Sequence, residues 1–156
     1  MSHTPEEVTA ITAALSQLPF YGYLKPLELE KLVDGFEKAP MAKGEVLITQ
    51  GKTGEIFYIL GSGSVGVYLT GKLVDKQIAL LEPPSYFGEM SLVSNEARTA
   101  SVICESDGVV YTLLRETFRR VILDNPHVAD HIRRTATERK AATKAIEYGE
   151  WMGRKM

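Results

Sequence analysis

Residues 54–68 read Gly54-Glu-Ile-Phe-Tyr-Ile-Leu-Gly-Ser-Gly-Ser-Val-Gly-Val-Tyr68. Two runs of β-branched and aromatic residues lie on either side of a glycine-rich turn, which is typical of two antiparallel strands with a tight connection. The same pattern recurs before and after this stretch. It predicts six strands: Val46 to Thr49, Ile56 to Leu60, Val65 to Leu69, Val74 to Leu81, Ala100 to Cys104 and Val109 to Leu114. Short strands divided by glycine turns favour an antiparallel barrel or sandwich, which can enclose a small ligand.

The segments on both sides of the strands have the helical period of apolar residues. Thr4-Pro5-Glu6-Glu7 has the composition of a helix start, and Pro26 begins a second helix. After the strands, helical spacing returns at Glu116 and continues beyond Asn125-Pro126 towards Tyr148. The sequence therefore predicts an α+β fold, in which helices precede and follow an antiparallel β-roll or jelly-roll barrel.

Composition limits the classes of protein to which the chain can belong. Its 156 residues suit one hydrophobic core, and its formal net charge of −2 offers no broad basic surface for nucleic acid. No run approaches the roughly twenty apolar residues of a membrane span, and the start lacks the features of a secretion signal. We therefore expect a cytoplasmic protein without a nucleic-acid partner. The single cysteine, Cys104, lies in an apolar run and is expected to be a buried thiol rather than a nucleophile.

One connection between predicted strands, Glu82 to Thr99, is too long for a hairpin and too apolar for a plain linker. Gly88 precedes a short helical phrase, whose first backbone N–H groups can bind an anion. At the other end of the connection, Arg98 can form a bidentate pair with a phosphate, and Thr99 can donate from its hydroxyl and its backbone. Glu89 is an acceptor for a sugar hydroxyl. These groups suit a ribose phosphate, although a salt bridge between Glu89 and Arg98 is the structural alternative.

The segments Tyr86-Phe-Gly-Glu-Met-Ser-Leu92 and Ala97-Arg-Thr-Ala-Ser-Val102 resemble the phosphate-binding cassette of cyclic nucleotide-binding domains. Residues 54–68 resemble the strand-turn-strand of that family, and the likeness extends from Phe20 to Leu123. It implies a ligand domain like that of catabolite activator protein, with a cassette at 86–102. The divisions expected are an N-terminal helical segment (1–38), the β-roll (39–115), the C-terminal B and C helices (116–148) and a tail (149–156).

The resemblance also implies a ligand and the residues that bind it. Arg98 would pair with the charge of the phosphate, while the amides near Gly88 hold its oxygens and Thr99 and Ala100 complete the cradle. Glu89 would accept from the ribose hydroxyl. The residues expected to bind the ligand are Gly88, Glu89, Met90, Ser91, Arg98, Thr99, Ala100 and Arg139. For the side chains of Tyr86, Phe87, Met90 and Leu92, packing beneath the cassette is the preferred interpretation.

Arg139 is expected to act from the last helix. It falls in the centre of an apolar stripe at the helical period, where a charged side chain needs a partner. One interpretation is a side chain that extends from the edge of the stripe to water, and the other is a cap over the bound base, as in relatives whose C-terminal helix closes the pocket. On the same helix His127 and His131 have a spacing that can serve zinc, but no third ligand is evident, so no metal is expected.

The function expected from the sequence is that of a cyclic nucleotide sensor, not an enzyme. Cyclic AMP is preferred because it is frequent in the family, while Thr99 leaves cyclic GMP open. The histidines all lie outside the strand region, which argues against a metal-dependent phosphodiesterase or cupin enzyme. A ligand-free interaction module of the same fold is a further alternative. The output is expected to pass through the C-terminal helix to an unnamed protein partner, with the chain either a fragment or a small protein.

Overall fold

The computed structural model describes residues 3–71, 73–92, 97–122, 124–131 and 133–134. Two four-stranded antiparallel sheets form a roll, with the strand orders β1-β8-β3-β6 and β2-β7-β4-β5. The strands are β1 (Glu37–Met41), β2 (Val46–Ile48), β3 (Ile56–Ser62), β4 (Val65–Thr70), β5 (Asp75–Leu81), β6 (Ser85–Phe87), β7 (Ser101–Cys104) and β8 (Gly108–Leu114). The helices are α1 (Pro5–Leu15), η1 (Tyr21–Tyr23), α2 (Pro26–Gly35), η2 (Glu89–Leu92) and α3 (Arg115–Val121).

The predicted α+β class with an antiparallel β-roll is confirmed, and all six predicted strands are present. Two further strands, β1 and β6, escaped the sequence analysis. The β1 sequence, Glu-Lys-Ala-Pro-Met, has no β-branched residue and contains Pro40, which cannot donate to a ladder. Proline is tolerated there because β1 lies at the edge of its sheet. The three residues of β6 lie inside the long connection and are too few to show a period.

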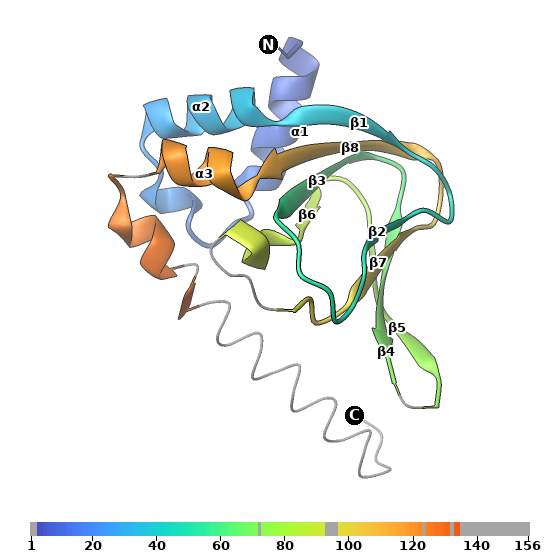
Figure 1. Ribbon diagram of the computed structural model, residues 1–156. Coiled ribbons are helices and arrows are strands. Elements are labelled where there is room, and N and C mark those ends of the chain that lie inside the picture. Colours follow the sequence, from blue (N-terminus) through green and yellow to red (C-terminus); the bar gives the residue numbers. More distant parts are fainter. Residues whose placement is uncertain (1–2, 72, 93–96, 123, 132, 135–156) are drawn as a thin grey trace.

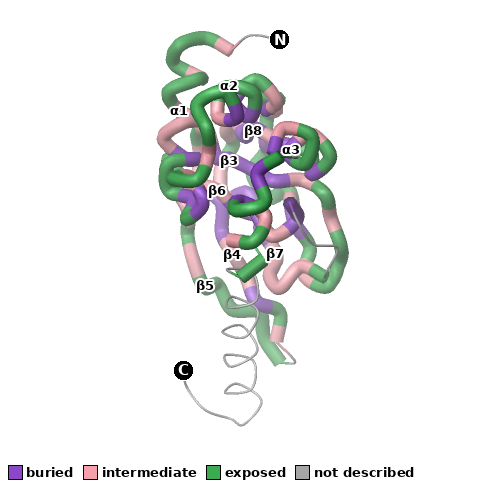
Figure 2. Tube along the Cα trace, turned by 90° about the vertical axis from the view of Figure 1, so that its left-hand side faces the viewer, coloured by how far each residue is buried: buried purple, intermediate pink, exposed green. Residues whose placement is uncertain are grey.

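The helices α1, α2 and α3 gather at one end of the roll, and the β4–β5 hairpin projects at the other (Figure 1). Strand β3 separates two cores because its side chains alternate between its faces. Phe57 and Ile59 pack against the helices, whereas Tyr58 and Leu60 face the inside of the roll. Buried residues follow β3 and β8 through the middle of the molecule (Figure 2). Cys104 is 1% exposed in the inner core, which confirms the prediction of a buried thiol.

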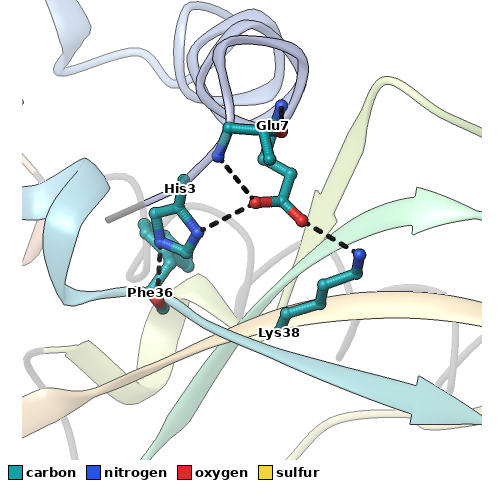
Figure 3. Close-up of polar contacts among 5 residues, drawn as sticks. His3, Glu7, Phe36 and Lys38 are labelled. Carbon is teal, nitrogen blue, oxygen red and sulfur yellow. Dashed lines mark hydrogen bonds and ion pairs between the residues drawn. The ribbon is translucent and has the colours of Figure 1, made fainter. Parts of the chain in front are cut away.

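A polar cluster joins α1 to β1. Thr4 and Glu7 cap α1 reciprocally, and the second carboxylate oxygen of Glu7 accepts from Lys38 Nζ at 2.9 Å. The imidazole of His3 lies beside this pair, with Nε2 2.8 Å from the carbonyl oxygen of Phe36 (Figure 3). The hydrogen bonds from the Thr4 backbone and from Lys38 lower the pKa of Glu7 from 4.5 to about 2. The Glu7–Lys38 ion pair, which is charged at neutral pH, therefore fixes the first helix to the sheet.

A second polar cluster joins the N-terminal helices to the residues that follow α3. The side-chain amide of Asn125 is 4% exposed and donates to the carbonyl oxygen of Tyr23 and to the Glu28 carboxylate, each at 2.9 Å. Glu28 also accepts from the backbone N–H of Lys25 at 2.8 Å. Residues 126–131, which follow Asn125, are helical. The cluster thus sets where the C-terminal helix starts relative to α2.

Candidate functional site

The connection singled out in the sequence leaves β6, turns at Gly88, forms η2 and reaches β7. Gly88 has φ +79, a left-handed conformation that side chains other than glycine rarely adopt. A Cβ atom at this position would lie 2.9 Å from Nη1 of Arg98 and 3.1 Å from the carbonyl oxygen of Ile56. The turn therefore requires glycine for its backbone conformation and also for space.

The structure brings Arg98 against Gly88, as the sequence predicted for two groups that share one anion. The guanidinium also lies against Gly54, where a Cβ atom would be 2.6 Å from Arg98 Nη2. Nη2 donates to the carbonyl oxygen of Ile56 at 3.1 Å. Burial lowers the pKa of Arg98, and the positive charge of Arg115 lowers it further, against the opposing effect of Tyr58. A bound anion stabilises a half-buried cation that feels the repulsion of a second cation.

Buried side chains and the hydroxyl of Ser91 hold the short helix η2 in place. Leu92 is fully buried and Phe87 is 6% exposed, with the Phe87 ring stacked on Tyr58 at a centroid distance of 5.0 Å. Ser91 Oγ lies 3.0 Å from the Ile56 carbonyl oxygen and 2.7 Å from that of Gly88. The packing interpretation of Phe87 and Leu92 is confirmed. The hydroxyl of Ser91, expected in the ligand site, holds the turn together in this structure.

A cavity of about 210 Å³ lies beside Arg98. It is lined by Leu47, Ile48, Thr49, Lys52, Thr53, Gly54, Glu55, Ile56, Tyr58 and Arg98. The strands β2 and β3 supply apolar walls, and the loop between them supplies polar groups. Glu55 on this loop has a carboxylate oxygen 3.8 Å from Nη2 of the buried Arg115. The cavity thus combines apolar surface with a few charged groups, as small-molecule sites do.

The sequence analysis missed the loop between β2 and β3. The backbone of this loop pairs with Arg98 on both sides: Gly51 N–H donates to the Arg98 carbonyl oxygen, and Arg98 N–H donates to that of Lys52, each at 2.8 Å. The signal for this loop in the sequence is the pair of glycines at 51 and 54, which predicts only a turn between two strands. The proximity of this loop to Arg98 depends on hydrogen bonds between segments that are far apart in the sequence, so no local sequence pattern predicts it.

Of the remaining residues expected in the site, all except Arg139 are among the residues that the structure describes. Glu89 is 8% exposed, whereas Met90, Thr99 and Ala100 are half-buried. Arg139 lies outside the described residues, as does most of the helix that was expected to carry it. The roles of all these residues towards a ligand stay predictions.

The histidine pair near the C-terminus and the question of a membrane span can both be compared with the structure. His127 is exposed, and the His131 ring lies 5.4 Å from that of Tyr23. In the part of the chain that the structure describes, no three His, Cys, Asp or Glu side chains come together as metal ligands would. Within the same residues, no helix has both the length and the apolar character needed to cross a bilayer.

The chain is similar in sequence to a known protein family and to several of its members. The family model described as the cyclic nucleotide-binding domain matches residues 39–125. The chain is 32% identical over 110 residues to the cAMP-dependent protein kinase regulatory subunit of Aspergillus niger, covering 70% of this chain and 26% of that protein. It is 31% identical over 122 residues to the cGMP-dependent protein kinase egl-4 of Caenorhabditis briggsae, covering 76% of this chain and 16% of that protein.

A solved structure gives the same answer for the fold. Cyclic AMP-bound PfPKA-R superposes with a TM-score of 0.72 at 25% identity, covering 78% of this chain and 43% of that one. The chain spans only about a quarter of the length of the Aspergillus relative. The matched residues include the cavity lining, Gly88 and Arg98. The chain belongs to the cyclic nucleotide-binding domain family.

Proposed function

We propose that this chain is a regulatory module that binds a cyclic nucleotide between the glycine turn and Arg98. The observation that carries the proposal is the contact between Gly88, which follows β6, and Arg98, which precedes β7, beside a cavity. Arg98 is partly buried, and a phosphate would stabilise its positive charge by a direct ionic hydrogen bond. A cyclic nucleotide carries one phosphate charge, and this suits a cavity with one guanidinium in its lining.

The other residues expected from the sequence complete the proposed site. Backbone N–H groups from Gly88 to Met90 bind the phosphate oxygens, because the first N–H groups of a helical turn are available to an anion. Ser91 N–H instead donates to the Gly88 carbonyl oxygen at 3.1 Å. The Glu89 carboxylate accepts from the ribose hydroxyl. Thr99 and Ala100 close the cradle on the side of β7. Apolar surface of the cavity, including Ile56, contacts the base.

Cyclic AMP is the proposed ligand, and cyclic GMP is the second candidate. The similarity to regulatory subunits of cAMP-dependent kinases supports the first. The similarity to a cGMP-dependent kinase supports the second, as does Thr99, whose hydroxyl can reach the amino group of a guanine in the syn conformation. Competitive calorimetry with both nucleotides decides between them, and tighter binding of cyclic GMP would overturn the preference for cyclic AMP.

The output is proposed to pass through the C-terminal helix. The Asn125 cluster ties the start of that helix to α2, so a change in helix position on ligand binding must be accommodated at this contact. Arg139 is proposed to cap the base from the same helix and thereby to link its position to occupancy of the cavity. A protein partner that contacts the helix then binds the ligand-bound and ligand-free forms differently. The module is proposed to have no catalytic activity of its own.

The most direct test of the class is to identify small molecules released from the purified protein. The protein is denatured, and the supernatant is analysed by ultraviolet spectroscopy and mass spectrometry. A purine absorption band with the mass of a cyclic nucleotide supports the proposal. If nothing is released, the ligand-free protein is titrated with both cyclic nucleotides, and the absence of binding to either contradicts it.

A further inference from the structure

The loop between β2 and β3 brings a second cation to the cavity. Lys52 lines this cavity together with Arg98, and it is exposed to solvent. Nothing in the sequence pattern of the cassette points to this residue, because it lies on a different connection. Its place beside Arg98 is a property of the fold alone.

The backbone holds Lys52 at a fixed register with Arg98. Arg98 N–H donates to the Lys52 carbonyl oxygen, and the preceding residue, Gly51, donates to the Arg98 carbonyl oxygen, each at 2.8 Å. Lys52 N–H in turn donates to the Thr49 carbonyl oxygen at 3.1 Å, and Gly51 has φ +87, which closes this turn. The lysine therefore lies on a hydrogen-bonded turn whose backbone also pairs with Arg98.

The charges around the cavity leave Lys52 available to a ligand. Glu55 is the one acidic residue in the lining, and its carboxylate is directed to Arg115 at 3.8 Å. Among the described residues, no carboxylate oxygen lies within the 4.0 Å of Lys52 Nζ that defines an ion pair. Two cations thus share the wall of one cavity. An anion placed between them relieves their mutual repulsion and is attracted by both.

We infer that Lys52 is a second cationic contact for the phosphate of the ligand, which it attracts into the cavity before Arg98 binds it. This inference rests on the proposed function and extends it by naming a binding residue outside the cassette. An exposed lysine differs physically from a half-buried arginine. Solvent and salt screen its field, so it acts chiefly on the rate of association and does so most at low ionic strength. Arg98 acts through direct contact and is much less sensitive to salt.

The test measures the association rate and the dissociation constant of cyclic AMP and cyclic GMP at low and high salt. Lys52→Ala should slow association and weaken binding by about threefold to tenfold at low salt, and Lys52→Glu should do so more strongly. Both differences should shrink towards wild type at about 1 M salt, where the screening length is about 3 Å. Lys52→Arg keeps the charge and should bind within about twofold of wild type.

Lys76 provides the matched control. It is exposed on β5 and does not line the cavity, so Lys76→Glu changes the net charge by the same amount without changing the site. Its association rate should stay close to that of wild type. If Lys52→Glu binds like Lys76→Glu at low salt, the role of Lys52 is overturned while the proposed function stands. If wild-type protein binds neither nucleotide at any salt concentration, both are overturned.

Discussion

Arg98 Nη1 lies 2.9 Å from the position that a Cβ atom of Gly88 would occupy. Gly88 directly follows β6 and Arg98 lies shortly before β7, and the fold closes the connection between these strands so that the two residues touch. The contact explains two features together: the left-handed turn at Gly88 and the partial burial of a guanidinium that keeps one side towards the cavity. An anion at this position meets the turn and the arginine at once.

Gly88→Ala should weaken nucleotide binding by tenfold or more. The added methyl group meets the Arg98 guanidinium and the Ile56 carbonyl oxygen, and the positive φ of 79 costs a further ~1–2 kcal/mol for any residue with a Cβ. Equilibrium titration and a thermal melt measure the two effects. Gly22→Ala is the control, because nothing lies within 4 Å of a Cβ atom at that position. Equal binding by both variants would show that the turn does not contact the ligand.

Asn125→Ala should destabilise the protein by ~1–3 kcal/mol, because the buried Glu28 carboxylate and the Tyr23 carbonyl oxygen lose a donor. Asn125→Asp has nearly the same shape but places a second carboxylate beside Glu28, so it should be at least as destabilising at neutral pH. Denaturant unfolding gives both values. A loss below ~0.5 kcal/mol in both variants would mean that the cluster does not hold the two segments together.

Glu7→Gln should change the acid limb of the stability curve. The folded pKa of Glu7 is about 2, below the ordinary value of 4.5, so the charged carboxylate stabilises the folded state fully above about pH 4.5. That contribution is lost as pH falls from about 4.5 to about 2. The variant should therefore be less stable than wild type at neutral pH and equally stable near pH 2.

Unfolding in denaturant at a series of pH values measures this difference. Glu6→Gln removes an exposed carboxylate from the preceding position and should alter the curve far less. A constant gap between Glu7→Gln and wild type across the acid range would contradict the assignment, since a difference that does not titrate cannot come from the charge of Glu7.

Arg139→Ala should weaken binding by ~1–3 kcal/mol and leave the melting temperature of the ligand-free protein unchanged. The reason is that a cap over the base contributes only when the ligand is present. Calorimetric titration and a thermal melt of the same preparation give the two quantities. Unchanged affinity would contradict the proposed cap and favour the alternative, a side chain that extends to water.

Much of this structure could be read from the sequence, for physical reasons that differ between elements. Strands β3, β4 and β8 are rich in β-branched and aromatic residues, so their local preference agrees with their place in the fold. Strand β1 has no such preference and forms because β8 offers it a partner at the edge of the sheet.

The residues of the site also differ in whether the sequence alone could predict them. Gly88 and Arg98 could be predicted to converge because each has a chemistry suited to the same anion. Lys52 could not, since its position depends on hydrogen bonds between its loop and Arg98. Local sequence carries information about what a residue can bind, and only the folded chain shows which residues share a cavity.

The central claim is that Arg98 supplies the counter-charge for the phosphate, and titration of Arg98→Ala with cyclic AMP and cyclic GMP tests it most directly. Truncation should cost about 3–5 kcal/mol of binding free energy, because the phosphate loses its direct ionic contact. Arg120→Ala, which removes an arginine that is 69% exposed from a surface ion pair, should bind as wild type does. A loss of less than tenfold in the Arg98 variant, with its fold intact, would contradict the account.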